Sequence, residues 1–333
     1  DCGHEWENHQ ATHNLKYRAG ESTTVGNNKN PKIYCEKVSQ GSFCSKCQAW
    51  KGQLGLEPSF DLYIDHLIQI FDEVKRVLKS AGTAWINLSD TYGGSGNGSW
   101  NAPIEIRGKQ YRKTCNIDQE YLAPPRNTKQ YAKSLLMIPY RFAIKMIEHD
   151  WKLRNIITWV KPNCMPSSAE DRFTNDSEPI FFFSKDKHYY FKQQYEPLVH
   201  DTLVRSKASF TSKKSENYGG LSSQNQIAWS KKVQEGEITE RNMRTTWNIA
   251  TQPSREEHFS TYPETLVARC VKSGCPPGGT VLDPFSGTGT TGIVALAHQC
   301  NYIGIELGKE YASRSEERIR EQLGLLVTSP DVI

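Results

Sequence analysis

Two stretches near the C-terminus decide the fold of this chain: Gly279-Thr-Val-Leu-Asp-Pro-Phe-Ser-Gly-Thr-Gly-Thr-Thr-Gly292 and Asn301-Tyr-Ile-Gly-Ile-Glu306. They predict a buried apolar strand, a glycine turn, the start of a helix, and a second strand that ends in a carboxylate. The glycines let the backbone turn sharply and approach a ligand closely. Glu306 lies 23 residues after Asp283, the spacing at which an acid meets a ribose hydroxyl pair. An ordinary tight turn between a strand and a helix is the alternative.

The composition is that of a globular chain. Its 333 residues suffice for one large domain or for a domain with insertions, and 23% of them are charged and 37% hydrophobic. No apolar run reaches the ~18 residues of a membrane span. The chain starts at Asp1 without a basic and then apolar leader, so we expect a cytoplasmic protein whose true N-terminus lies upstream. Cysteines scattered along such a chain are expected to be reduced thiols.

The basic residues are clustered, although the net charge is only +4. Residues 203–232 carry six Lys and Arg against one Glu, and residues 107–133 carry seven against two acids. A local basic excess of this kind suits a polyanion such as nucleic acid. A solvated loop face is the alternative for either stretch taken alone.

The first 50 residues hold a group of cysteines that differs from the scattered ones. Cys44-Ser-Lys-Cys47 is a CxxC knuckle, and Cys2-Gly-His4 offers two further ligands. Two thiolates with a Cys/His pair predict a closed, structural zinc site, formed by Cys2, His4, Cys44 and Cys47. Cys35 or His9 is an alternative ligand, and free thiols or a redox pair are the alternatives to a metal.

Alternating strands and helices predict an α/β protein with a doubly wound, mostly parallel sheet. Helical spacing of apolar residues predicts helices over 60–79, 139–149, 263–273 and 310–321. Strands are predicted over 83–88 and 155–160, and a closing hairpin from 178–184 and 188–191. A polar stretch, 195–245, interrupts this pattern.

Several segments resemble the beta group of DNA amino-methyltransferases, whose motif order is permuted so that the catalytic half comes first. Asp283-Pro-Phe before the glycines resembles the family's S-adenosylmethionine (AdoMet) loop, and three further segments resemble family segments in the same order: Ala84–Tyr92, Thr158–Pro166 and His258–Pro263. The resemblance implies a Rossmann-like AdoMet-dependent methyltransferase fold. It divides the chain into 1–50 (zinc-knuckle-like insertion), 51–194 (catalytic half), 195–245 (target-recognition insertion), 246–325 (AdoMet-binding half) and 326–333 (tail).

The resemblance also implies a set of cofactor-binding residues. Asp283 is expected to hold the methionine amino group and Glu306 the ribose diol. Phe259 and Phe285 are expected in the cofactor cleft or in the core, and Asn87 and Asp90 at a strand tip facing the cleft. The full predicted set is Asp283, Pro284, Phe285, Ser286, Gly287, Thr288, Gly289, Glu306, Phe259, Ser260, Asn87 and Asp90.

The family's catalytic tetrapeptide, an acid or Ser followed by Pro-Pro and an aromatic, is not found in this chain. Ala123-Pro-Pro-Arg126 and Cys275-Pro-Pro-Gly278 lack both the polar first residue and the aromatic. The catalytic residues are therefore unknown at this point. Either an upstream segment carries the tetrapeptide or the chain is a degenerate copy.

The activity implied by the resemblance is site-specific methylation of double-stranded DNA in a prokaryotic or phage-infected cell, as in restriction–modification systems. The methyl group would pass from AdoMet to cytosine N4 or adenine N6 of a flipped base. DNA contacts are expected from Lys213, Lys214, Lys231, Lys232 and Arg205. An inactive AdoMet- or DNA-binding module and an NAD-dependent oxidoreductase are the alternatives, and a monomer and a homodimer are both left open.

Overall fold

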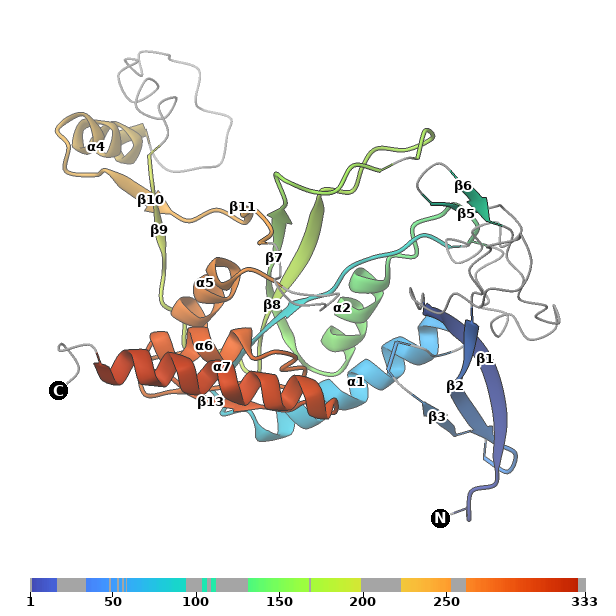
Figure 1. The fold of residues 1–333 in the computed structure, drawn as a ribbon. Helices are drawn as coiled ribbons and strands as arrows, with labels where there is room; N and C mark the ends of the chain where they lie inside the picture. The colour runs from blue at the N-terminus through green and yellow to red at the C-terminus, as the bar shows by residue number, and fades with distance from the viewer. Residues whose placement is uncertain are drawn as a thin grey trace. The chain divides into compact units, whose positions relative to one another are not determined.

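The computed structural model divides into two compact units, residues 1–77 with 88–151 and residues 78–87 with 152–333 (Figure 1). The structure describes residues 2–16, 34–47, 49–52, 54–55, 57, 59–93, 104–106, 109–111, 131–167, 169–198, 223–252 and 262–328. Among the described helices, none combines the length and apolar character needed to cross a membrane.

The first unit contains an antiparallel sheet, a short hairpin and two helices. The sheet runs in the order β1 (Trp6–Lys16), β2 (Tyr34–Cys44), β3 (Trp50–Gly52). The hairpin pairs β5 (Ile104–Ile106) with β6 (Lys109–Tyr111). The helices are α1 (Phe60–Val77) and α2 (Ile138–Glu148), which agree with the predicted helices to within two residues at each end.

Helices α1 and α2 pack through their apolar faces. The buried residues of α1 recur at helical spacing, namely Ile64, Leu67, Ile68 and Phe71. Phe71 meets Phe142 of α2 edge to face, with ring centroids 5.3 Å apart. The Ser59 hydroxyl accepts a hydrogen bond from the Leu62 amide at 3.2 Å, which caps the start of α1.

The second unit is built on a four-stranded sheet in the order β11 (Thr246–Asn248), β7 (Lys152–Val160), β8 (Ser177–Ser184), β4 (Thr83–Asn87). Strand β8 is antiparallel to both neighbours, while β11 is parallel to β7. Three of the four strands therefore run in one direction, although two of the three pairings are antiparallel. The predicted mostly parallel sheet is in fact mixed.

The hairpin predicted from 178–184 and 188–191 is wrong. Strand β8 pairs instead with β7 and β4. Its Ile180 lies opposite Ile157 of β7, and its Phe181 lies opposite Ile86 of β4. Its run Ile180–Phe183 is buried throughout, which is typical of a central strand covered on both faces. The aromatic run at 188–191 packs against this sheet instead, since Tyr189 and Phe191 contact the Phe182 ring.

A β–α–β element carries the glycine turn. Strand β12 (Thr280–Asp283) lies parallel to β13 (Asn301–Gly304), and α6 (Thr290–Ala297) connects them. Helices α5 (Glu264–Gly274) and α7 (Lys309–Thr328) both pack on α6. This is the strand–turn–helix–strand order that the sequence predicts.

The predicted recognition insertion contains three described elements. Strands β9 (Tyr195–Pro197) and β10 (Glu240–Asn242) pair with each other, and α4 (Ser223–Gln234) precedes β10. The basic positions between β9 and α4 lie outside the described residues.

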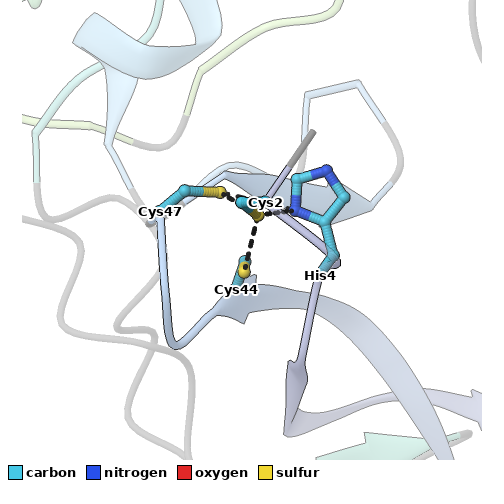
Figure 2. Close-up of side chains that lie close together, drawn as sticks. All are labelled: Cys2, His4, Cys44 and Cys47. Atoms are coloured by element: carbon cyan, nitrogen blue, oxygen red, sulfur yellow. Dashed lines mark hydrogen bonds between the residues drawn. The ribbon is translucent and has the colours of Figure 1, made fainter.

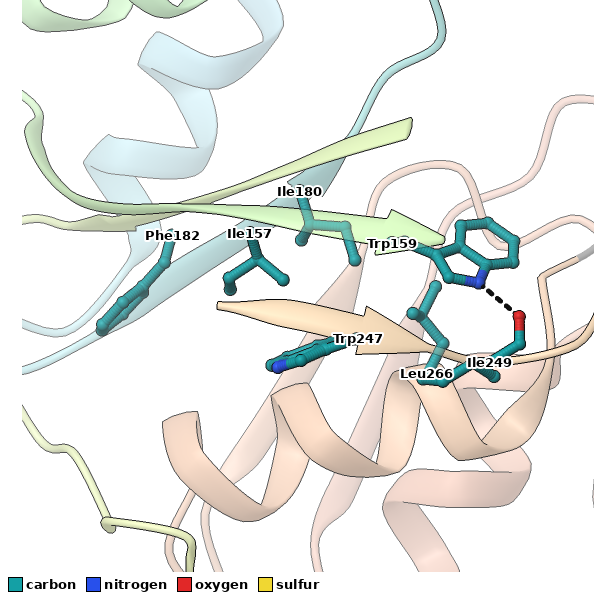
Figure 3. Packing of buried hydrophobic residues seen from close by; sticks show 7 residues of the cluster. All are labelled: Ile157, Trp159, Ile180, Phe182, Trp247, Ile249 and Leu266. Carbon is teal, nitrogen blue, oxygen red and sulfur yellow. Dashed lines mark hydrogen bonds between the residues drawn. The ribbon is translucent and has the colours of Figure 1, made fainter. Parts of the chain in front are cut away.

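The core of the second unit joins the sheet to α5 (Figure 3). Its buried members are Ile157, Trp159, Ile180, Phe182, Trp247, Ile249 and Leu266. The Trp159 indole N–H donates to the carbonyl of Ile249 at 2.8 Å, so this large ring is buried without an unsatisfied donor. Phe182 also stacks on Trp85 of β4, at 4.1 Å between ring centroids.

Phe182→Ala is expected to destabilise the fold by about 3–5 kcal/mol, because it removes a ring that is 2% exposed and leaves a cavity between β4, β7 and β8. Phe173→Ala is the matched control, since Phe173 is 97% exposed and should change stability by less than about 0.5 kcal/mol. Urea unfolding followed by circular dichroism measures both. Equal effects of the two substitutions would contradict this assignment of the core.

Candidate cofactor-binding site

The glycine loop closes against the end of β13. The Ile305 amide donates to the Asp283 carbonyl at 2.9 Å, and the Ser286 amide donates to the Ile305 carbonyl at 3.0 Å. Gly287 and Gly289 have φ angles of +51° and +82°, in the left-handed region that glycine tolerates best. At Gly289, an added Cβ would lie 2.3 Å from the Ser315 hydroxyl oxygen. The loop therefore has both the conformation and the tight packing that only glycine permits.

The Asp283 carboxylate is the anchor of the loop. Its Oδ1 accepts the Phe285 amide at 2.9 Å. Its Oδ2 accepts the Thr291 hydroxyl at 2.6 Å and lies 3.1 Å from the Tyr262 hydroxyl. The Tyr262 hydroxyl oxygen also lies 2.7 Å from the Thr291 hydroxyl oxygen. The two hydroxyls and Asp283 Oδ2 therefore lie within hydrogen-bond distance of one another. Burial, together with the negative charge of Asp283, raises the pKa of Tyr262, which keeps this phenol a neutral donor.

Glu306 fastens the same loop from the other side. Its Oε2 accepts the Gly287 amide at 2.9 Å, and its Oε1 accepts the Gly308 amide at 2.8 Å. Each carboxylate oxygen has two acceptor positions, so each retains one for a further donor. The predicted ribose-binding acid thus lies directly at the glycine turn.

Two predicted cofactor residues use their side chains to brace the loop. The Ser286 hydroxyl exchanges a hydrogen bond with the Tyr302 hydroxyl at 2.8 Å, and burial raises the pKa of Tyr302 to about 12. Arg318 of α7 donates to the carbonyl and hydroxyl oxygens of Thr288, at 2.7 and 2.9 Å. Both Ser286 and Thr288 are buried. Any contact of these two residues with a cofactor would therefore come from the backbone.

Aromatic and apolar side chains remain exposed beside the two carboxylates. Phe285 is 46% exposed, so it is not a core residue. Ile305 and Leu307, which flank Glu306, are also exposed, Leu307 to 98%. An apolar surface next to hydrogen-bonding groups is typical of ligand sites.

The remaining predicted cofactor residues have structural partners or lie outside the described residues. The Asn87 amide donates to the Pro179 carbonyl at 3.1 Å. Asp90, in the first unit, accepts backbone amides of Thr91, Met137 and Ile138 and so caps the start of α2. Phe259 and Ser260 are among the positions that the structure does not describe. The cofactor roles of these four residues stay predictions.

The loop after β7, which lies in the predicted catalytic half, is held by contacts of Lys161 and Asn163. Lys161 pairs with Glu178, and its ammonium lies 4.4 Å from the centroid of the Trp159 ring. Asn163 exchanges hydrogen bonds with Thr251, accepting its amide at 2.8 Å and donating to its carbonyl at 2.9 Å. These contacts join the loop to the segment after β11.

The predicted metal and DNA residues fall into separate places. Cys2, His4, Cys44 and Cys47 come together, with their ligand atoms within 4.8 Å of one another (Figure 2). Lys231 and Lys232 are exposed in the last turn of α4. Lys213, Lys214 and Arg205 lie outside the part of the chain that the structure describes.

Four residues that brace the site were not predicted as site residues: Tyr262, Thr291, Tyr302 and Arg318. Tyr262 belongs to the segment His258–Pro263 that the sequence placed on the cofactor side, and a tyrosine directly before a helix was a usable signal. Thr291 lies within the glycine stretch itself. Arg318 belongs to a helix that the sequence predicts, but nothing in its spacing indicates that it contacts Thr288.

A parallel strand–glycine turn–helix–strand element with two carboxylates at its loop defines an α/β protein with a nucleotide-type cofactor site. The family profile N6_N4_Mtase, described as DNA methylase, matches residues 19–317. The chain therefore belongs to this family of DNA methylases.

Individual relatives agree with this membership. The chain is 35% identical over 271 residues to the Type II methyltransferase M.SmaI of Serratia marcescens, covering 80% of this chain and 77% of that protein. It is 34% identical over 268 residues to the Type II methyltransferase M.Cfr9I of Citrobacter freundii, covering 80% and 75%. Among solved structures, the cytosine-N4-specific PvuII DNA methyltransferase aligns with 80% of this chain and 78% of its own, at 16% identity and a TM-score of 0.47.

Tyr262→Phe and Thr291→Val are each expected to lower the free energy of unfolding by about 1–3 kcal/mol, because each removes a donor from the Asp283 carboxylate. The double variant should be non-additive by at least about 0.5 kcal/mol, since both hydroxyls serve one oxygen atom. Urea unfolding measures all three variants. Tyr195→Phe, at an exposed tyrosine, is the control and should be near neutral. Strict additivity would mean that the two hydroxyls act independently.

Proposed function

We propose that this DNA methylase is an AdoMet-dependent enzyme that methylates an exocyclic amine, cytosine N4 or adenine N6, of a base flipped out of duplex DNA. The observation that carries the proposal is that two backbone amides of the glycine loop donate hydrogen bonds to carboxylates. Asp283 accepts the Phe285 amide and Glu306 accepts the Gly287 amide.

This arrangement favours AdoMet over a dinucleotide. In dinucleotide-binding folds, the amides of the glycine turn face a pyrophosphate at the start of the helix. Here the amides of Phe285 and Gly287, in the loop before α6, donate to carboxylates, whose negative charge would repel a nearby pyrophosphate. A ligand with a cationic amino group and a ribose diol suits the same atoms. Family membership and this charge pattern both argue against the NAD-dependent alternative.

The residues present fit the parts of AdoMet. Asp283 offers negative charge to an amino group, and each oxygen of Glu306 retains an acceptor position for a hydroxyl. The exposed side chains of Phe285, Ile305 and Leu307 offer apolar contact to an adenine ring. When bound, AdoMet supplies a methyl group already activated by a sulfonium. The protein's task is then chiefly to position the donor and the amine.

No residue of this chain is assigned to the amine itself. Cys275-Pro-Pro-Gly278 forms the turn between α5 and β12, where the Cys275 amide donates to the carbonyl of Val271 at 2.9 Å and the Gly279 amide to that of Pro276 at 2.8 Å. This stretch is therefore a structural connection. Ala123–Arg126 lies outside the described residues.

Glu306→Ala is expected to weaken AdoMet binding by about tenfold to a hundredfold, since a hydrogen bond involving a charged group contributes ~1.5–3 kcal/mol. Glu306→Gln should lose less, because one acceptor oxygen remains. Glu310→Ala removes an exposed acid four residues further on and is the matched control. Calorimetry with AdoMet and with NAD measures the affinities. Unchanged AdoMet affinity in Glu306→Ala would refute the assignment.

A methyl-transfer experiment with the parent chain and the Glu306→Ala variant identifies the methylated base. Duplex DNA is incubated with the chain and AdoMet carrying a labelled methyl group, digested to nucleosides, and analysed by chromatography and mass spectrometry. We expect label in N4-methylcytosine or in N6-methyladenine, and less of it with Glu306→Ala. AdoMet binding without any transfer would favour the inactive binding module instead.

The 195–245 insertion is the proposed DNA-recognition region. Its β9–β10 pair is held by Glu196, whose Oε1 accepts Arg241 at 2.9 Å and Arg244 at 2.6 Å. Burial alone would raise the pKa of Glu196, but the guanidinium groups of Arg244 and Arg241 lower it overall. This favours the charged carboxylate that the two arginines contact. These two arginines therefore stabilise the β9–β10 pair, and the exposed lysines of α4 are the proposed contacts with DNA.

Helix α4 presents suitable groups on one side. Ser230 and Val233 are buried, whereas Trp229, Lys231 and Lys232 are exposed. Lys231 has one surface partner, Glu235, at 3.7 Å, a type of pair that contributes little. Exposed lysines beside an aromatic ring suit phosphate contacts combined with groove or stacking contacts.

Replacing Lys231 and Lys232 by Gln should weaken duplex binding and flatten its dependence on log salt concentration by up to about two units, roughly one for each phosphate that is no longer neutralised. AdoMet affinity should not change. A double Lys187→Gln, Lys272→Gln variant removes two other exposed lysines of the same unit and is the control. Fluorescence anisotropy over a salt series measures the slope. A parental slope would point to the basic 107–133 segment.

A further inference from the structure

The first unit contains a cluster of soft ligands that the methyl-transfer chemistry does not use. Cys2 and His4 precede β1, Cys44 ends β2, and Cys47 lies in the turn that leads to β3. Figure 2 shows the four side chains converging from these separate positions. We infer that they form a structural zinc site of three thiolates and one imidazole.

The distances agree with the edges of a zinc tetrahedron. Bonds of about 2.3 Å to sulfur and about 2.0–2.1 Å to nitrogen imply edges of roughly 3.7 Å between sulfurs and roughly 3.5 Å between sulfur and nitrogen. Cys2 Sγ lies 3.7 Å from Cys44 Sγ, and Cys47 Sγ lies 3.4 Å from His4 Nδ1. Cys2 is closer to Cys47 Sγ, at 3.2 Å, and to His4 Nδ1, at 2.8 Å. A shift of less than about 1 Å in Cys2 would bring these two distances to the expected edge lengths, and all four ligand atoms already lie within 4.8 Å of one another.

A disulfide explains the cluster less well. Its sulfurs would lie about 2.05 Å apart, whereas Cys2, Cys44 and Cys47 are all free thiols here. Any disulfide would also leave the third thiol and the imidazole nitrogen without a role. Thiolate and imidazole ligands favour zinc over magnesium or calcium. Because the protein supplies all four ligands, no position remains open for a substrate, and the site is structural.

Backbone conformation and hydrogen bonds bring the two ligand pairs together. Gly3 has a φ of +57°, the left-handed conformation that turns the chain between Cys2 and His4. The Ser45 amide donates to the Glu5 carbonyl at 2.9 Å, and the Cys44 amide donates to the Ala49 carbonyl at 2.8 Å. The first bond joins the two ligand pairs, and the second closes the CxxC turn.

Lys46 stands beside the cluster and supplies positive charge. It pairs with Glu5 at 2.6 Å and donates to the Gly3 carbonyl at 3.4 Å. Zinc with three thiolates carries one net negative charge, so a neighbouring ammonium is a favourable partner.

The site would stabilise the N-terminal sheet by joining its strands. Strand β3 has three residues, so the sheet is little more than the β1–β2 hairpin, and a two-stranded hairpin is marginal alone. Zinc ties residue 2 to residue 47, across both strands of that hairpin. The metal would therefore be coupled to the folding of this sheet.

The test uses the full chain, with zinc measured by mass spectrometry after exhaustive dialysis. About one zinc per chain is expected, and cobalt(II) substitution should give the visible absorption of a tetrahedral thiolate site. Cys44→Ser and His4→Ala should each weaken zinc binding by more than about a hundredfold in competition with a chelator, which exceeds the roughly 10–100-fold effect of losing an outer partner. His4→Cys should restore binding as a four-thiolate set.

Cys164→Ser, at a thiol outside the cluster, is the control and should keep full zinc content. Chelation should raise protease cleavage within residues 1–52 while AdoMet affinity stays unchanged, which separates this site from the proposed activity. A chain that binds neither zinc nor cobalt, or a loss of metal in Cys164→Ser equal to that in Cys44→Ser, would overturn the inference. So would a disulfide among Cys2, Cys44 and Cys47 in the purified chain.

Discussion

The C-terminal β12–α6–β13 element depends on the hydrogen bonds of the Asp283 carboxylate. This carboxylate joins the Tyr262 hydroxyl ahead of α5, the Thr291 hydroxyl of α6 and the Phe285 amide of the loop. A half-buried charge is tolerated because donors surround it. The same bonds fix where β12 ends and where the turn into α6 begins. The Asp283 carboxylate therefore both holds the loop in position and gives it negative charge.

Glu306, two residues after β13, makes the matching contact with the Gly287 amide, and we propose that the two acids together select the ligand of the glycine turn. Glycine turns of this kind serve many ligands, because the glycines provide only backbone freedom. Selectivity comes from the groups that occupy the amides. With carboxylates on the amides of Phe285 and Gly287, the turn suits a ligand with a cationic group and hydroxyls. This physical reason agrees with membership of a DNA methylase family.

The sheets of the two units differ in the contacts that the structure describes around them. The second buries a run of aromatic residues in β8, against a sheet and α5. The N-terminal sheet of the first unit instead has a cluster of thiols and an imidazole at its base. We propose that a metal at that cluster joins the two long strands of this sheet and so adds to its stability.

Elements with a local signal were predictable from the amino-acid sequence. The helical spacing of α1 and α2, the apolar strand β4 and the glycine turn between β12 and α6 were all predictable, because period and turn chemistry are properties of neighbouring residues. The CxxC and CxH pairs were also visible, and the structure brings them together. Only the tertiary structure decided that β8 pairs with β7 and β4, that Tyr262 and Thr291 share one oxygen of Asp283, and that Arg318 holds Thr288. Each of these depends on which distant segments meet when apolar faces are buried, and periodicity within a segment carries no information about its partner.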